Sequence, residues 1–331
     1  MIDVAKAYTL AWRHAPKIPE PLLRAAFTVV ADVTWWRRGS GVRRLEANYA
    51  RVRPDLDARG VRALARAGMR SYMRYFREAF TLQGASPAQV DARVRLVGHD
   101  EVLGPLLDRP GARRGAAVLA LAHLGNWDLA GAYCSRHIAP VLTVAEKLKP
   151  EALFHEFVAF RRSLGIEALG LGDGEVFRGL LAGVLGGDRL VPLLADRDLT
   201  ATGVEVDLCG HRARVAAGPA ALALAAKAPL VPTTITYERL SGERRRAART
   251  PWGIVIQFHD PVTLPDPLPD GVRTRPEQVA HLSQAWVDVI ARTLTERTED
   301  WHMLQRVFVA DLDPVRDQER RASAVHDGAA S

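Results

Sequence analysis

The spacing of hydrophobic residues divides the chain into two parts. Before about residue 100, apolar side chains recur every three or four residues, which is the period of an amphipathic helix. The clearest segment of this kind runs from 61 to 80, and a second runs from 22 to 36. The first places these apolar residues on one helical face: Val61, Ala65, Met69, Tyr72, Phe76 and Phe80. The pattern predicts a helical region over 1–100.

Short, continuous apolar runs replace the helical pattern after residue 111. The clearest is AAVLALA at 116–122, which is too short for a helix and typical of a buried strand. Similar runs lie at 140–145, 190–195, 204–208, 230–237 and 252–258. Helical patterns lie at 127–137, 150–163, 174–186, 218–228 and 276–297. This alternation predicts an α/β fold with a central, mostly buried mixed sheet flanked by helices.

The length and composition favour one soluble globular unit. The chain has 331 residues, of which 48% are hydrophobic and 25% charged, enough for a sizeable core. No linker forces a second domain, so we expect a single domain over 1–312, made of the helical region 1–100 and an α/β core over 111–312. The tail 313–331, rich in Arg, Asp, Ala and Ser, is expected to be disordered.

The charge is strongly basic, with a formal net charge of +7 and a pI near 9.8. Such a chain is attracted to nucleic acid, anionic lipid or an acidic substrate. The arginines are scattered and no helix-turn-helix, zinc-finger or RNA-binding sheet motif occurs, so nucleic-acid binding is not expected. No apolar run reaches the roughly 18 residues of a membrane span, and 1–20 lacks a secretory pattern. We therefore expect a cytoplasmic protein, free or lying on a membrane.

Two N-terminal segments each allow two interpretations. The 61–80 helix carries arginines on a second face: Arg62, Arg66, Arg70, Arg74 and Arg77. This arginine stripe is either the solvated back of a core helix or a face for an anionic membrane or ligand. The 22–36 segment, with aromatic residues next to Arg37 and Arg38, either lies at a headgroup boundary or is buried in the domain. Region 1–100 is thus a candidate membrane-docking region.

The candidate chemistry follows the first apolar run, in the sequence HLGNWD at 123–128. His123 and Asp128 differ by about 140° in direction on one continuous helix and could not touch there. They meet only if His123 ends the strand, Gly125 turns the chain and Asn126 caps a helix whose first turn holds Asp128. The carboxylate could then orient the imidazole, and His123 would be a general base for a hydroxyl. The alternative is a strand-end histidine with a purely structural aspartate.

Other polar residues have less specific surroundings. Asp196, Arg197 and Asp198 end an apolar run, where charges are costly unless they are paired, so they are candidates for a site wall. Arg161 follows an apolar helix face and fits a salt bridge as readily as a contact to the phosphate of coenzyme A. The backbone amides near Gly125 and Asn126 begin a helix and are candidate oxyanion donors.

The cysteines and the absence of certain motifs exclude several kinds of site. Cys134 and Cys209 cannot form a disulfide scaffold, and both are interpreted as packing residues. No Gly-x-Ser-x-Gly sequence occurs, which counts against a serine hydrolase. No Cys or His cluster has metal-binding spacing, so no metal and no cofactor are expected.

HLGNWD after a buried strand resembles the His-x4-Asp signature of the lysophospholipid acyltransferase superfamily, and more closely its branch containing the bacterial lipid A late acyltransferases. Further segments are similar to the phosphatidylinositol mannoside acyltransferases of actinobacteria. They are GVRRLEANYARVRP at 41–54, AEKLKP at 145–150, FVAFRRSLG at 157–165, ADRDLTATGVEVDLCG at 195–210, AAGPAALALA at 216–225 and WHMLQRVF at 301–308. The resemblance covers roughly residues 1–312.

The resemblance implies transfer of a fatty acyl group from acyl-CoA to a mannose 6-hydroxyl of phosphatidylinositol mannoside. His123 would be the base and Asp128 its orienting partner. The third acidic catalytic residue of the family, usually a glutamate, falls on Asp196, which is one methylene shorter. The resemblance places the family's supporting glutamate on Glu146 and its arginine on Arg161. Further candidates for support or substrate binding are Asn126, Arg197, Asp198 and Glu205. Because a thioester is already activated, we expect direct attack by the hydroxyl without an acyl-enzyme.

The implied partners are acyl-CoA as co-substrate, a mannosylated phosphatidylinositol and an anionic membrane surface. A peripheral protein on the cytoplasmic face of the cell membrane fits these partners. Two alternatives remain open: an acyltransferase acting on another glycolipid or lysophospholipid, and a non-enzymatic protein that binds anionic surfaces.

Overall fold

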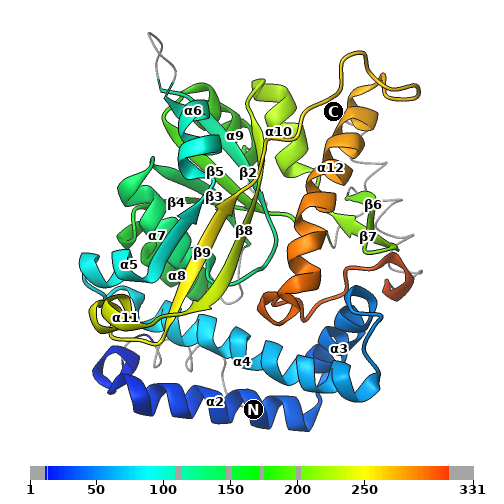
Figure 1. Cartoon of the computed structure of the whole chain (residues 1–331). Coiled ribbons are helices and arrows are strands. Elements are labelled where there is room, and N and C mark those ends of the chain that lie inside the picture. Colours follow the sequence, from blue (N-terminus) through cyan, green and yellow to red (C-terminus); the bar gives the residue numbers. More distant parts are fainter. Residues whose placement is uncertain are drawn as a thin grey trace.

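A seven-stranded sheet forms the centre of the molecule (Figure 1). The structure, a computed structural model, describes residues 12, 14–108, 114–146, 151–171, 175–198 and 203–312. The strands are β1 (Val94–Val97), β2 (Ala116–Leu121), β3 (Val141–Ala145), β4 (Ile166–Gly170), β5 (Arg189–Leu194), β6 (Val204–Leu208), β7 (His211–Val215), β8 (Leu230–Arg239) and β9 (Trp252–Phe258). The central sheet has the order β1-β9-β8-β2-β5-β3-β4.

Only one neighbouring pair in this sheet, β8 with β9, is antiparallel, so the sheet is mixed, as predicted. Strand β2 lies in the middle and all six of its residues are buried. Its parallel neighbour β5 ends level with it, because Leu121 is paired with Leu194. The residues that follow these two strands therefore emerge side by side at one edge of the sheet.

The helices of the described residues cover both faces of the sheet and one of its ends (Figure 1). They are α2 (Glu20–Arg37), α3 (Ser40–Val52), α4 (Ala58–Leu82), α5 (Pro87–Arg93), α6 (Gly104–Leu107), α7 (Trp127–His137), α8 (Glu151–Ser163), α9 (Val176–Leu185), α10 (Gly218–Ala226), α11 (Gly242–Ala248) and α12 (Arg275–Glu296). Shorter turns are η1 (Ala15–Lys17), η2 (His99–Leu103), η3 (Thr298–Asp300) and η4 (Val309–Asp311).

The core is split by the alternation of side chains along β2. Ala117, Leu119 and Leu121 point to a cluster that includes α7 and α8 residues. Val118 and Ala120 point to the opposite cluster, which includes residues of α9, α10 and α12. Because successive side chains of a strand face opposite sides, a fully apolar strand must be covered on both faces.

Three strands were not predicted, and one predicted strand lies outside the central sheet. Strands β1, β4 and β7 are short and have no continuous apolar run. The predicted strand at 204–208 is confirmed as β6, but it pairs only with β7 in a separate hairpin beside α12. Apart from β1, the described part of 1–100 is helical, as predicted. The expected disordered tail, 313–331, lies outside the described residues.

The arginines of the α4 stripe have partners within the protein. Arg62 binds Glu46 of α3 at 2.5 Å, and Arg66 and Arg70 both bind Asp32 of α2. The Arg70 and Arg66 guanidinium groups hold the pKa of the Asp32 carboxyl well below its usual range.

The other two arginines of the stripe point inward. Arg74 lies over the ring of Trp252, with 3.6 Å between guanidinium carbon and ring centre. Arg77 is buried and binds Glu20 and Glu78. The stripe therefore joins α4 to α2, α3 and the sheet.

No helix in the described part of the chain combines the length and the hydropathy needed to cross a bilayer.

Candidate active site

The turn between β2 and α7 has the geometry that the sequence predicts. Gly125 has φ +60°, and a Cβ atom there would lie 2.4 Å from the carbonyl oxygen of Ile235, so only glycine fits. Asn126 caps α7 by accepting a hydrogen bond from the backbone N–H of Leu129 at 3.0 Å. Asp128 lies in the first turn of α7. Strand, glycine turn, cap and first-turn carboxylate are all confirmed.

His123 is oriented by Asp196. Its Nδ1 lies 2.6 Å from Oδ1 of Asp196, and its backbone N–H donates to Oδ2 at 3.0 Å. The contact exists because β2 and β5 are parallel neighbours that end together. The shorter side chain of Asp196, compared with the usual glutamate, still reaches the imidazole.

The charge of the Asp196 carboxylate decides which ring nitrogen of His123 donates the hydrogen bond. Burial raises the pKa of this carboxyl, but the adjacent His123 and the hydrogen bonds from His123 and Trp301 outweigh burial and lower the pKa below its ordinary value. An ionised carboxylate only accepts hydrogen bonds, so Nδ1 of His123 is the donor. In a neutral imidazole the other ring nitrogen, Nε2, carries the lone pair, and nothing in the described residues hydrogen-bonds to it. The imidazole is 20% exposed at this position.

Asp128 does not contact His123, which corrects the expected pairing. The Tyr75 hydroxyl donates to its Oδ2 at 2.7 Å, and Nε of Arg161 donates to its Oδ1 at 2.9 Å. Asp128 is 1% exposed and Arg161 is 7% exposed. The carboxylate therefore joins α7 to α4 and α8, while Asp196 takes the orienting role expected of Asp128.

Asn126 has a second contact besides the cap. Its Nδ2 donates to Oε2 of the buried Glu78 at 2.7 Å, and Arg93 binds the same oxygen at 2.6 Å. Burial raises the pKa of Glu78, but Arg93, Arg77 and the hydrogen bond from Asn126 together lower it below the ordinary value. The turn that carries His123 is thus attached to α4 through the buried, charged side chain of Glu78.

Two further predicted residues lie next to Asp196. Arg197 donates to Oε1 of Gln305 at 2.6 Å and to Oε2 of Glu146 at 3.2 Å. Glu146 is the more exposed partner of this pair. Arg197 and Glu146 therefore form part of the wall beside the dyad. The rest of AEKLKP, 147–150, lies outside the described residues.

Asp198 and Glu205 lie toward the hairpin. The backbone N–H of Asp198 donates to the carbonyl of Arg214 at 2.9 Å. Glu205 is on β6, where its carboxylate binds Arg212 and Arg214. The structure thus places Glu205 in the hairpin, apart from the turn that carries His123.

One candidate oxyanion donor is already occupied. The backbone N–H of Gly125 donates to the carbonyl of Asp300 at 2.9 Å. An amide whose proton is committed in this way does not point at a reacting oxygen, so Gly125 is removed from the candidates.

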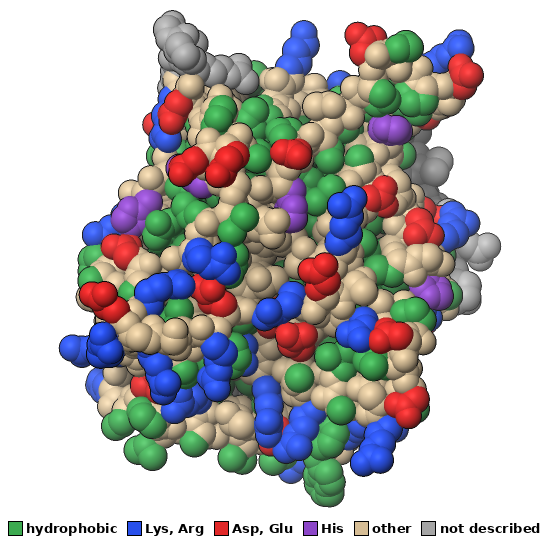
Figure 2. Space-filling model, in the orientation of Figure 1, with side chains coloured by type: hydrophobic (Ala, Val, Ile, Leu, Met, Phe, Trp, Pro, Cys, Tyr) green, Lys and Arg blue, Asp and Glu red, His purple; other side chains and the backbone are tan. Residues whose placement is uncertain are grey.

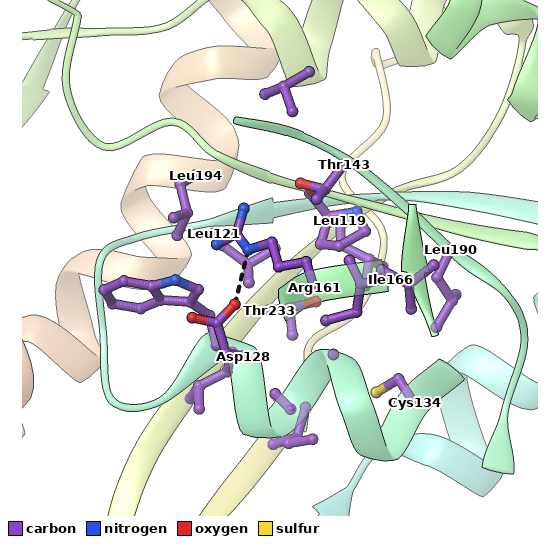
Figure 3. Close-up of a pocket in the computed structure, with 18 of the residues that line it drawn as sticks. Leu119, Leu121, Asp128, Cys134, Thr143, Arg161, Ile166, Leu190, Leu194 and Thr233 are labelled. Carbon is purple, nitrogen blue, oxygen red and sulfur yellow. Dashed lines mark hydrogen bonds and ion pairs between the residues drawn. The ribbon is translucent and has the colours of Figure 1, made fainter. Parts of the chain in front are cut away.

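An apolar cavity lies beside the Asp128–Arg161 pair, between the sheet and α7 (Figure 3). The cavity is small, with a volume of about 60 Å³, and it is partly open to solvent. Its lining comes mainly from strands and α7, and includes Leu119, Leu121, Cys134, Ile166, Leu190 and Leu194. Trp127 lines it and packs edge-on against the His123 ring at 5.5 Å between ring centres. The cavity therefore reaches the turn between β2 and α7 at Trp127.

The cysteines are poor nucleophiles. Burial raises the pKa of the Cys134 thiol to about 12, and burial also raises the pKa of the Cys209 thiol.

In the described ranges, no group of three or more His, Cys, Asp or Glu side chains is arranged to hold a metal ion.

A family model described as bacterial lipid A biosynthesis acyltransferase matches residues 4–309. The chain belongs to this family. It is therefore an acyltransferase, and the expected resemblance is confirmed. Phosphatidylinositol mannoside acyltransferases of Mycolicibacterium smegmatis and Mycobacterium tuberculosis are each 36% identical to it, over 95% and 96% of this chain and 93% and 92% of theirs. Among solved structures, the 1-acyl-sn-glycerophosphate acyltransferase of Thermotoga maritima aligns with 83% of this chain and 95% of its own, at 14% identity and a TM-score of 0.33.

Sequence reasoning did not find three side chains that build this acyltransferase site. They are Tyr75 and Glu78 on α4, and Trp301, whose Nε1 donates to Oδ2 of Asp196 at 2.7 Å. Of these three, only Trp301 could have been found from the sequence, because it begins the family-like segment WHMLQRVF. Tyr75 and Glu78 look like ordinary positions of an amphipathic helix.

Proposed function

We propose that this acyltransferase moves a fatty acyl group from acyl-CoA to the 6-hydroxyl of a mannose on a phosphatidylinositol mannoside. The names of two relatives that align over more than 90% of both chains support the acceptor. The single observation that carries the chemistry is the hydrogen bond between Nδ1 of His123 and Asp196, which leaves Nε2 without a partner among the described residues. The apolar cavity adjoins this pair at Trp127, which packs against the His123 ring.

The reaction needs one base and no covalent enzyme intermediate. Nε2 of His123 takes the proton of the sugar hydroxyl while the hydroxyl oxygen attacks the thioester carbonyl carbon. The C–S bond then breaks, and the departing thiolate receives the proton from the imidazolium. Asp196 stabilises the imidazolium while it exists, because its buried carboxylate is ionised. The raised pKa values of the Cys134 and Cys209 thiols make both poor nucleophiles, which is consistent with direct attack by the hydroxyl and no acyl-enzyme.

The apolar cavity suits part of a fatty chain. Most of its lining is hydrocarbon, and the two charged residues that line it, Asp128 and Arg161, are paired with each other. At about 60 Å³ it has room for only a few methylene groups, each of which gains about 0.8 kcal/mol when it leaves water.

The test is transfer of labelled acyl groups to defined acceptors. Purified protein is incubated with radiolabelled acyl-CoA and with phosphatidylinositol mannoside, a lysophospholipid or an unrelated glycolipid. We expect one acyl chain to appear on the mannosylated lipid, with mass fragments that place it on the mannose. Turnover with the lysophospholipid alone would contradict the proposed acceptor, and transfer only from an acyl carrier protein would contradict the proposed donor.

We also propose that the protein works as a peripheral protein on the cytoplasmic face of the cell membrane, docked through the outer face of α2. That face exposes a row of apolar side chains, each between 41% and 73% exposed: Leu22, Val29, Val30, Val33 and Trp36. Exposed basic residues, among them Arg37, Arg43 and Arg44, lie at its C-terminal end. Figure 2 shows hydrophobic side chains among basic ones along the edge that α2 forms. An apolar stripe with a basic rim fits an anionic bilayer surface.

Liposome flotation tests this surface. Replacing Val29, Val33 and Trp36 by serine should abolish flotation with anionic vesicles. The matched control replaces Phe177 and Leu185 of α9 by serine, because these are 46% and 66% exposed and lie away from α2 (Figure 1). Equal flotation of both variants, or binding that does not grow with anionic lipid, would contradict the docking proposal.

A further inference from the structure

Residues 300–302 hydrogen-bond to the turn between β2 and α7 that carries His123. The backbone N–H of His302 donates to the carbonyl of His123 at 2.8 Å. In the opposite direction, the N–H of Gly125 donates to the carbonyl of Asp300 at 2.9 Å. The residue between them, Trp301, is completely buried. Its indole therefore has a fixed place beside the turn.

The indole N–H points at the carboxylate that orients the base. Nε1 of Trp301 donates to Oδ2 of Asp196 at 2.7 Å, a short, charge-assisted hydrogen bond. The same oxygen accepts the backbone N–H of His123 at 3.0 Å. Two donors thus occupy Oδ2, and Oδ1 is left for the imidazole at 2.6 Å.

We propose that Trp301 is a positioning residue for the acyl transfer, and that its indole N–H fixes the carboxylate of Asp196 so that Oδ1 faces the imidazole of His123. The terminal torsion of an aspartate is broad, so the carboxylate plane is set by its hydrogen-bond donors. A buried carboxylate that loses one donor reorients toward the others or admits water. The hydrogen bond to the imidazole then lengthens, and His123 is a weaker base. The inference rests on the proposed function, in which His123 is the base.

Trp301 is itself anchored from two directions, which makes it a rigid donor. The Tyr49 hydroxyl donates to its carbonyl at 2.8 Å, and the two rings stack at 6.4 Å between centres. The preceding Asp300 accepts hydrogen bonds from the Ser71 hydroxyl at 2.9 Å and the Tyr237 N–H at 2.8 Å. The N-terminal helices therefore reach the dyad through Trp301.

The test compares two buried tryptophans. Trp301→Phe removes the donor and keeps most of the apolar ring. Trp286→Phe is the matched control, because Trp286 is 1% exposed and its Nε1 has no hydrogen-bond partner in the described structure. We expect Trp301→Phe to lower kcat about 10- to 100-fold, the effect of losing one hydrogen bond to a charged group, with KM for acyl-CoA unchanged. The control should keep the parent kcat.

A double-mutant cycle separates positioning from general damage. With Asp196→Asn already present, Trp301→Phe should lower kcat less than about twofold, whereas independent changes multiply within about that factor. A loss of kcat that is the same with and without Asp196→Asn would overturn the proposal. So would a loss equal to that of Trp286→Phe.

A readout without turnover keeps the inference distinct from the proposed reaction. Proton NMR of the parent should show a low-field Nδ1 proton of His123, identified by its loss in His123→Gln. That signal should persist in Trp286→Phe and move upfield or vanish in Trp301→Phe. An unchanged signal in Trp301→Phe would overturn the positioning role, whereas the correct signals without acyl transfer would overturn only the proposed function.

Discussion

Removing the guanidinium of Arg161 tests whether Asp128 is a structural residue. In the structure, the Asp128 carboxylate has two partners, Arg161 and the Tyr75 hydroxyl, and it is 1% exposed. Arg161→Met leaves the carboxylate buried with one neutral partner. Breaking one side of a buried ion pair costs about 3–5 kcal/mol, a large share of the roughly 5–15 kcal/mol that stabilises a native protein.

Urea unfolding followed by tryptophan fluorescence measures this loss. The control is Arg178→Met, which breaks an ion pair whose side chains are 77% and 80% exposed and is worth at most about 1 kcal/mol. Adding Asp128→Asn to Arg161→Met should recover part of the lost stability, because the uncompensated charge is gone. Equal unfolding midpoints for Arg161→Met and the control would refute the structural role of Asp128.

Three further predictions concern pH and the cavity. Burial lowers the pKa of His302 well below its ordinary value, so the unfolded chain binds a proton that the folded one excludes. The free energy of unfolding should therefore fall by up to about 1.4 kcal/mol per unit as pH drops below about 6.5, and His302→Gln should remove this part of the slope in a pH series of urea titrations. The pKa of Glu78 is lowered, so its stabilisation is present at neutral pH and lost in acid; Glu78→Gln should unfold more easily than the parent at pH 7, and the gap should close below about pH 4 in the same titrations. Cys134→Phe fills the cavity and should shift the best donor to shorter acyl-CoA chains in a chain-length series; an unchanged optimum would place the fatty chain elsewhere.

The catalytic turn could be predicted because its geometry depends on adjacent residues. A glycine that must turn and an asparagine that caps a helix are local signals, and both act at the expected positions. The partner of His123 is different, because Asp196 is 73 residues away and meets the imidazole only through the pairing of β2 with β5. The sequence order made Asp128 look closer to His123 than it is.

The arginine stripe of α4 also has partners that are far away in the sequence and could not be predicted from it. On α4 alone, Arg66 and Arg70 form a single-sign surface. Their partner Asp32 lies more than 30 residues earlier, on α2. Helical periodicity predicts which residues share a face, but it does not predict which helix covers that face. The exposed apolar row on α2 became visible only once α4 had been placed beneath it.

The most direct test of the account compares two aspartate-to-asparagine changes of the same size. Acyl transfer to phosphatidylinositol mannoside is measured for Asp196→Asn and Asp128→Asn, each divided by its folded fraction. We expect Asp196→Asn to lower kcat by about 10²–10⁴, the scale of losing an oriented base, while Asp128→Asn stays within about tenfold of the parent. A large loss in Asp128→Asn with a nearly normal Asp196→Asn would contradict it.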